Sequence, residues 1–231
     1  MSKINHLDNN LELEGKRVLL RVDFNVPINS GIINESSRIE KVLPTINFLI
    51  KKKAKIIIIS HIGRPNGKII TNLTLKPIAE KLSKLINKNI SFLKEPIESK
   101  TIDKSKNISN GEIIMLENLR FNKEEELNEE SFAKKLSKLG DIYVNEAFSC
   151  SHRTHASVSK ITEYIKPFAG IELIKEVNSI NMLTNDAKKP VTCIIGGSKI
   201  STKIGILNNL IKKMQNIVIV GALANNFIKY K

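Results

Sequence analysis

Short aliphatic runs alternate with amphipathic segments along this chain, and this alternation constrains the fold more than any other feature. Residues 56–59 are four consecutive isoleucines, a pattern typical of a strand buried on both faces of a parallel sheet. The same reasoning predicts strands over 17–23, 90–93, 113–116 and 141–145. It predicts helices over 37–53 and 74–86, and a third helix that follows an acidic run at 123–130 and ends at 139. This order predicts an α/β fold, a Rossmann-like parallel sheet with helices on both faces.

The predicted helix over 37–53 carries two local signals. Ser37 and Glu40 have the spacing of a capping box, which predicts that the helix begins at Ser37. Pro44 lies inside the same segment and predicts a kink or a later helix start.

The pattern changes around residues 167–170, which predicts a domain boundary. We expect a first domain over 1–169 and a connecting helix within 170–188, the helix itself over 171–183. A second α/β domain would open at 189–231, with strands at 191–195 and 217–220 and a helix ending at 213. Its roughly 40 residues are too few to close a hydrophobic core alone.

Composition excludes several classes of protein. The longest aliphatic run is far shorter than the roughly 18–20 residues that a membrane span needs, so we expect no membrane association. The polar start of the chain indicates no signal peptide. Cys150 and Cys193 are 43 positions apart in no metal-binding pattern, which predicts a reducing, cytoplasmic environment.

The net charge of +14 leaves a nucleic-acid partner open as an alternative. Only six of the 37 basic residues are arginines, however, and the 31 lysines are scattered along helix-like segments. Aromatic residues, on which single-stranded nucleic acids stack, make up 5% of the chain. A lysine-coated surface is therefore the favoured interpretation and a nucleic-acid partner the disfavoured one.

The arginines and histidines gather just beyond the predicted strands. In α/β sheets, ligands bind at the carboxyl ends of the strands, and arginine is suited to bidentate contact with phosphate or carboxylate. The segments predict a site for a small polyanion such as a phosphorylated carboxylic acid, formed by Asp23, Asn25, Arg38, His61, Gly63, Arg64, Arg120 and Arg153.

Simpler interpretations of these residues stay open. Each arginine could pair with a surface carboxylate, and Asp23 could be a turn residue. His152 and His155 have no further ligand cluster beside them, so we predict no metal site.

Residues 196–203 (GGSKISTK) follow a predicted strand and open a predicted helix. Glycines and free N–H groups at a helix start favour phosphate, although a plain tight turn is an alternative. Lys199 and Lys203 are four positions apart, which would let both face one anion from the same side of the helix.

Together the segments 17–27 (RVLLRVDFNVP), 60–65 (SHIGRP), 117–121 (ENLRF), 145–157 (NEAFSCSHRTHAS) and 196–203 closely resemble the phosphoglycerate kinase family. The resemblance runs from near the start of the chain to residue 231. It implies a two-domain, monomeric, cytoplasmic enzyme of glycolysis. The enzyme would transfer phosphate reversibly between 1,3-bisphosphoglycerate and ADP, giving 3-phosphoglycerate and Mg-ATP.

The resemblance also assigns roles to residues. Arg38 and Lys203 would be catalytic, and Gly196, Gly197, Lys199 and Lys203 would bind the nucleotide with its Mg²⁺. The phosphoglycerate site would consist of Asp23, Phe24, Asn25, Arg38, His61, Ile62, Gly63, Arg64, Arg120 and Arg153.

The chain departs from the family in length and at two positions. The family's second domain extends further, with a later glycine-rich nucleotide loop. Residues 221–223 (GAL) stand where two glycines are usual, and Glu146 where aspartate is usual. We therefore expect a truncated chain, and we keep a catalytically impaired 3-phosphoglycerate-binding fragment as the alternative.

Overall fold

The computed structural model describes residues 4–29, 31–183, 188–197, 201 and 203–230. The chain forms two compact units that divide between Glu176 and Val177. Both residues lie inside helix α7 (Ile171–Asn181), so one helix contributes to both units. The finer division at 169 and 188 stays a prediction.

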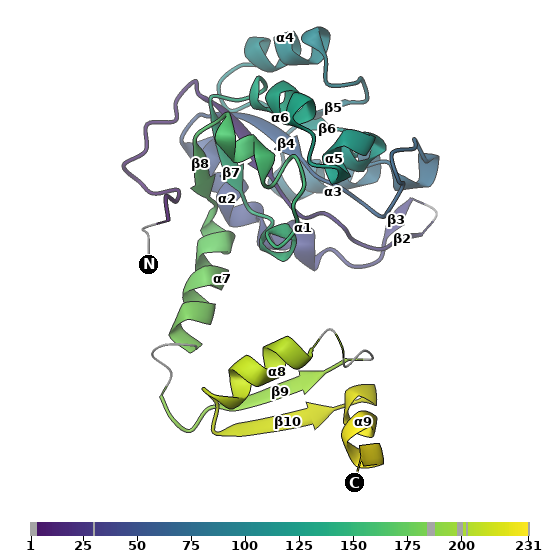
Figure 1. Ribbon diagram of the computed structural model, residues 1–231. Helices are drawn as coiled ribbons and strands as arrows, with labels where there is room; N and C mark the ends of the chain where they lie inside the picture. Colours follow the sequence, from purple (N-terminus) through teal and green to yellow (C-terminus); the bar gives the residue numbers. More distant parts are fainter. Residues whose placement is uncertain (1–3, 30, 184–187, 198–200, 202, 231) are drawn as a thin grey trace. The chain divides into compact units, whose positions relative to one another are not determined.

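The first unit is built on a six-stranded sheet in which every neighbouring pair of strands is parallel (Figure 1). The strand order is β5-β6-β4-β1-β7-β8. The strands are β1 (Arg17–Arg21), β4 (Lys55–Ile59), β5 (Ile90–Leu93), β6 (Ile113–Leu116), β7 (Ile142–Asn145) and β8 (Pro167–Ala169). The predicted α/β class with a parallel sheet is confirmed.

Alternating side chains of the strands contribute to two hydrophobic cores, one on each face of the sheet. In β4, Ile56 and Ile58 belong to the first core, whereas Ile57 and Ile59 belong to the second. Helices α1 (Ser37–Lys41), α2 (Leu43–Lys51) and α3 (Lys76–Ile86) contribute to the first core, and α6 (Glu130–Ser137) contributes to the second. Burial on both faces explains the unbroken aliphatic run that the sequence shows.

The predicted helix over 37–53 is in fact two helices. Pro44 lies in the first turn of α2, where its missing N–H costs nothing, and α1 ends at Lys41. The predicted capping box was wrong: the N-cap residue is Ser36, and its hydroxyl donates to Glu40 at 2.5 Å.

Several elements were not predicted. The acidic run forms its own short helix α5 (Lys123–Glu126), and α4 (Ser99–Asn107) is a further helix. Strands β2 (Ile28–Asn29) and β3 (Ile32–Ile33) form a small antiparallel pair. The remaining short turns are 3₁₀ helices at Thr71–Leu73, Leu119–Phe121, Phe148–Cys150 and Lys160–Glu163.

The second unit, taken by itself, is a small βαβ arrangement. Strands β9 (Thr192–Gly196) and β10 (Asn216–Val220) are parallel, joined by α8 (Ile204–Ile211) and followed by α9 (Ala222–Tyr230). Both strands are exposed at every second residue, and large aliphatic side chains such as Ile194, at 69% exposure, face solvent. The described part of this unit therefore buries little of its apolar surface.

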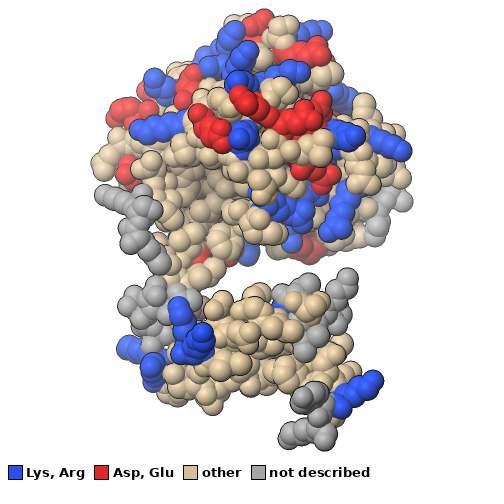
Figure 2. Space-filling view, viewed as in Figure 1, with Lys and Arg blue, Asp and Glu red and all other residues tan. Residues whose placement is uncertain are grey.

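Lysines and arginines on the first unit are interspersed with acidic residues on the face shown in Figure 2. The second unit shows mostly uncharged side chains there. Among the described residues, no helix combines the length and apolar character that crossing a membrane requires.

Candidate functional site

Four loops meet at one edge of the sheet because they follow four adjacent parallel strands. The loops begin after β6, β4, β1 and β7, which are neighbours in that order. They contain residues 117–121, 60–64, 22–25 and 146–153. All of these segments except 22–25 carry arginines or histidines. The carboxyl ends of parallel strands are where α/β proteins bind ligands.

Arg38 and Asp23 form an ion pair at the outer part of this edge. Arg38 Nη1 donates to Asp23 Oδ2, and Ser149 Oγ donates to the same oxygen. Asp23 Oδ1 accepts from Asn25 N at 3.1 Å, so Asp23 is also the turn residue that one interpretation suggested. The Arg38 side chain is 46% exposed, which leaves it accessible to a ligand.

Gly63 connects two of these loops through its backbone. Its N–H donates to Asn25 Oδ1 at 3.0 Å, and its carbonyl accepts from Arg120 Nη1 at 2.7 Å. Asn118 bonds both the N–H and the carbonyl of Ile62. These contacts fix the loop after β4 against the loops after β1 and β6.

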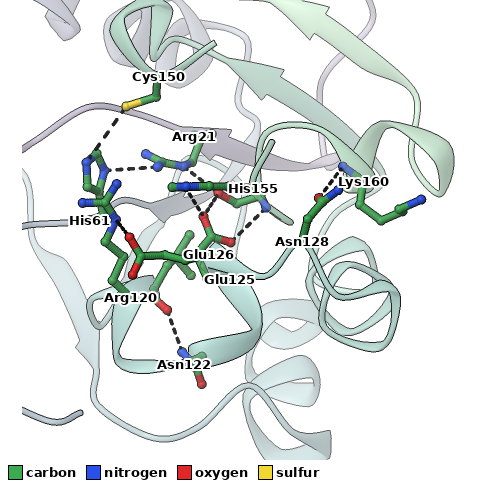
Figure 3. A network of polar contacts seen from close by, with 12 residues as sticks. Arg21, His61, Arg120, Asn122, Glu125, Glu126, Asn128, Cys150, His155 and Lys160 are labelled. Carbon is green, nitrogen blue, oxygen red and sulfur yellow. Dashed lines mark hydrogen bonds and ion pairs between the residues drawn. The ribbon is translucent and has the colours of Figure 1, made fainter. Parts of the chain in front are cut away.

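His61 and Arg21 form the buried inner part of the site (Figure 3). Arg21 Nη2 lies 3.1 Å from His61 Nδ1. A guanidinium can only donate, so Nδ1 accepts and the neutral ring carries its proton on Nε2. That nitrogen lies 4.0 Å from Cys150 Sγ. His61 thus presents an N–H donor beside Cys150.

Burial and the surrounding cations keep His61 uncharged. Burial is the main cause that holds the pKa of His61 far below its usual value, and the guanidinium groups of Arg21, Arg120 and Arg153 add to it. The pKa of His155 is lowered by burial and then by Arg120. Both imidazoles are therefore neutral at pH 7.

Arg120 and Arg153 carry buried nitrogens without hydrogen-bond acceptors. These are Arg120 Nε, Arg120 Nη2 and Arg153 Nε. Arg120 Nε lies 3.3 Å from Glu126 Oε1, close enough for attraction but without hydrogen-bond geometry. A buried donor left unpaired costs about 1–3 kcal/mol. An anion whose oxygens reach these nitrogens would recover that free energy.

Glu125 is the fully buried carboxylate of this network. It accepts from Ser157 N at 2.9 Å and Ser157 Oγ at 2.5 Å, and Ser157 Oγ accepts in turn from Arg21 Nε at 2.9 Å. Burial raises the pKa of Glu125, whereas the charge of Arg21 opposes that rise. Glu125 partly balances the guanidinium charge behind the site.

The structure brings most of the predicted site residues together, although their ligand roles stay predictions. Phe24 and Ile62 lie buried behind the site. Arg64 is exposed next to Gly63. Hydrogen bonds join Asp23 to Asn25 and to Arg38, and Gly63 to Asn25 and to Arg120. His61 is bound to Arg21, and the charge of Arg153 contributes to the lowered pKa of His61.

The predicted nucleotide-binding residues lie in the second unit. Gly196 ends β9, and a side chain placed on Gly197 would lie 3.6 Å from Lys203 Cε. Lys203 is the N-cap of α8. The predicted placement of Lys203 inside a helix, on one face with Lys199, is therefore corrected; Lys199 itself lies outside the described residues.

The sequence did not indicate three members of the network: Arg21, Glu125 and Cys150. Arg21 is a charged residue at the end of an apolar strand, which was a usable signal. Glu125 lies in an acidic run that resembles a solvated helix start. Nothing in the local pattern marks it as fully buried.

Asp23, His61 and Cys150 have ligand atoms within 4.8 Å of one another, the geometry of a candidate metal site. His61 Nδ1 already accepts a hydrogen bond from Arg21, and the protonated Nε2 faces the cluster, so neither ring nitrogen offers a lone pair to a cation. Asp23 is already bound by Arg38 and Ser149. Cation binding would have to displace these contacts amid several guanidinium groups, so the cluster suits an anion better.

We predict that His61 makes the protein less stable below pH 6.5. Its pKa is lower in the folded state than its usual value of 6.5. The folded state keeps its full stability above the pKa that His61 has in the unfolded chain. It loses stability as the pH falls below that value, because only the unfolded chain takes up the proton. The slope approaches about 1.4 kcal/mol per pH unit. Urea unfolding of wild type and His61→Gln between pH 7 and 5 measures it; equal slopes would contradict the prediction.

We also predict that Gly63→Ala destabilises the site loop. Gly63 has φ +63°, and an added Cβ would lie 2.8 Å from Leu73 Cδ2. Gly111→Ala is the matched control, since its φ is +77° with open space around it. We expect about 1 kcal/mol for Gly111→Ala and about 2–3 kcal/mol for Gly63→Ala by urea unfolding. Equal losses would show that Leu73 moves aside freely.

Comparisons with known proteins point to one family. The family model described as phosphoglycerate kinase matches residues 8–231. The phosphoglycerate kinase of Wolbachia pipientis wMel is 49% identical over 96% of this chain and 55% of that relative. The phosphoglycerate kinase of Bartonella bacilliformis is 46% identical over 95% of this chain and 55% of its own length.

Solved structures agree with the sequence comparisons. A phosphoglycerate kinase from Coxiella burnetii has a TM-score of 0.84 at 40% identity, covering 95% of this chain and 55% of its own. One from Pyrococcus horikoshii OT3 has a TM-score of 0.88 at 28% identity, covering 98% and 57%. The chain spans about half the length of the curated relatives it matches.

Proposed function

The chain belongs to the phosphoglycerate kinase family, and from that premise we propose that its first unit binds 3-phosphoglycerate. We further propose that it takes part in reversible phosphoryl transfer between 1,3-bisphosphoglycerate and ADP, the glycolytic reaction that gives 3-phosphoglycerate and ATP. The activity, substrates and partners of the whole enzyme are proposals for this chain, because the chain covers only about half of its relatives.

One observation carries the substrate proposal. Guanidinium groups from distant parts of the sequence meet at the carboxyl ends of four parallel strands, and two of them hold buried, unpaired N–H donors. A doubly or triply anionic metabolite supplies both the charge and the acceptor oxygens that this site lacks. Neutral His61 would donate its Nε2 proton to the same ligand.

Arg38 would supply charge where the phosphoryl group is transferred. It is half exposed, and its partner Asp23 is also bound by Ser149, so releasing Arg38 would leave Asp23 with another donor. The attacking group is a carboxylate, which is ionised at pH 7 and needs no general base. Catalysis would then consist of positioning and charge stabilisation.

The nucleotide would bind through the second unit, with Gly196, Gly197 and Lys203 near its phosphates. Gly196 ends β9 and Gly197 follows it, and the Lys203 side chain lies against Gly197. Mg²⁺ would arrive as part of the nucleotide substrate. The cluster of Asp23, His61 and Cys150 does not suit Mg²⁺, which prefers oxygen ligands.

Calorimetric titration with 3-phosphoglycerate tests the binding proposal. We expect a saturable exothermic signal that weakens with added salt, and no comparable signal with unphosphorylated glycerate. No heat at millimolar 3-phosphoglycerate would overturn the proposal. A coupled assay of ATP consumption tests turnover separately, so a chain that binds without phosphorylating would be identified.

We propose that the protein acts as a monomer in the cytoplasm. Both described cysteines, Cys150 and Cys193, are free thiols, as a reducing compartment would keep them. Light scattering at micromolar concentration tests the monomeric state.

A further inference from the structure

Glu146 is a buried carboxylate that helix donors, rather than cations, hold in place. Glu146 directly follows the last residue of β7 and is 5% exposed. Oε1 accepts from Thr45 Oγ1 and, at 3.1 Å, from Glu172 N; Oε2 accepts from Leu173 N at 2.9 Å. Among the residues that the structure describes, no ion pair is recorded for Glu146. All three recorded partners donate, which suits the ionised form, although burial raises its pKa.

Two of these donors, Glu172 N and Leu173 N, belong to the first turn of α7, and Thr45 belongs to α2. A helix leaves its first backbone N–H groups without internal partners, and a carboxylate there also meets the positive end of the helix dipole. Ile171 N donates to Thr45 Oγ1 at 3.1 Å, while the next two N–H groups bind Glu146. The cap of α7 thus comes from α2 and from the loop after β7, not from the residue that precedes the helix.

Gly170 makes this cap possible. A Cβ built on Gly170 would lie 2.2 Å from Glu146 Oε2. A side chain at this position would therefore displace the carboxylate from the helix end. The space that glycine leaves is filled by the capping group.

The cap and the candidate anion site share one cavity. The cavity has a volume of about 170 Å³, and its lining includes Asp23, Arg38 and Ser149 together with Glu146 and Glu172. Ser149 lies three residues after Glu146 in the same loop and donates to Asp23. Arg38 and Asp23 therefore line the same cavity as Glu172, which lies in the first turn of α7. A ligand that moves Arg38 or Asp23 thus acts close to the start of this helix.

We propose that Glu146, together with Thr45, is a positioning residue that transmits anion binding at Arg38 and Asp23 to the first turn of α7. The inference rests on the proposed binding of 3-phosphoglycerate. Helix α7 continues into the second unit, which begins at Val177. Ligand binding would therefore stiffen the helix from which the second unit starts.

Hydrogen exchange of the amides at 171–173, combined with calorimetry, tests this on the full chain. In wild type, saturating 3-phosphoglycerate should slow exchange of these amides. In Glu146→Gln and Thr45→Val, exchange without ligand should be about 5- to 30-fold faster, as expected for a lost helix cap. In these two variants the ligand should no longer slow exchange of these amides. The Kd for 3-phosphoglycerate should change less than threefold, because neither side chain is proposed to touch the ligand.

Two matched variants separate positioning from general stability. Thr45→Ser keeps the hydroxyl and should restore wild-type behaviour. Thr101 lies on α4, and its buried hydroxyl donates to the Pro96 carbonyl. Thr101→Val removes this hydroxyl and should leave exchange at 171–173 unchanged.

The outcomes are distinct for the two proposals. The inference would be overturned, and the proposed function left intact, if all variants bind 3-phosphoglycerate and the ligand still slows exchange at 171–173 in Glu146→Gln and Thr45→Val. The absence of 3-phosphoglycerate binding in wild type would overturn both.

Discussion

Replacing Arg153 with methionine should weaken 3-phosphoglycerate binding about 30- to 150-fold while leaving the folded protein at least as stable as wild type. Each charge-assisted hydrogen bond to a ligand contributes on the order of 2–3 kcal/mol, which corresponds to that range of affinity. Arg153 has a buried Nε without an acceptor and lies near the cationic Arg21 and Arg120. Removing its charge therefore relieves repulsion among these guanidinium groups.

Arg17→Met is the matched control, because its effects should have the opposite pattern. Arg17 Nη2 pairs with Asp141 Oδ1 at 2.6 Å, and Nη1 donates to the Lys138 carbonyl at 3.0 Å. This pair lies at the start of β1, away from the site edge. We expect a loss of about 1 kcal/mol in the free energy of unfolding and unchanged ligand affinity.

Calorimetry and urea unfolding of the two variants measure both quantities. A marked loss of stability in Arg153→Met would show that this arginine is structural. Unchanged affinity in the same variant would remove it from the proposed site. Weakened binding in Arg17→Met would mean that the site has been placed wrongly.

Replacing Glu125 with alanine should cost about 3–5 kcal/mol of folding free energy, because it removes one partner from a buried charged network. The substitution leaves Arg21 without its nearby carboxylate and Ser157 N without its acceptor. For a domain of this size, we expect the midpoint of thermal unfolding to fall by roughly 6–20 °C. Glu125→Gln keeps the shape and one acceptor, so its loss should be smaller.

The neighbouring Glu126 provides the control for this prediction. Its side chain is 32% exposed and lies 3.3 Å from Arg120 Nε without forming a hydrogen bond. Glu126→Ala should therefore cost no more than about 1 kcal/mol. Similar thermal shifts for the two alanine variants would contradict the assignment of Glu125 as the buried counter-charge.

The class of fold could be predicted from the sequence because the signals are local. Four consecutive isoleucines are typical of a strand buried on both faces, and Ile56 of β4 belongs to one core while Ile57 belongs to the other. Pro44 marked the break between α1 and α2 for the same local reason. The start of α1 at Ser37 was predicted correctly, but the capping residue was missed by one position, because it is Ser36.

The location of the candidate site was also predictable in outline. The order of strands and helices implies parallel strands, and parallel strands place their carboxyl ends on one edge. Arg38, Arg120 and Arg153 could thus be expected near one another before any contact was known. Arg21 could have been added, because strand alternation places it on the same face as Leu19.

The sequence by itself determined the strand and helix pattern and which loops share an edge, because these follow from periodicity within a few residues. Only the tertiary structure decided the pairings: which carboxylate lies behind Arg21, which nitrogen of His61 holds the proton, and which side chains cap α7. Each of these depends on groups dozens of residues apart in the chain. Their energies arise from burial and mutual distance, which no local pattern encodes.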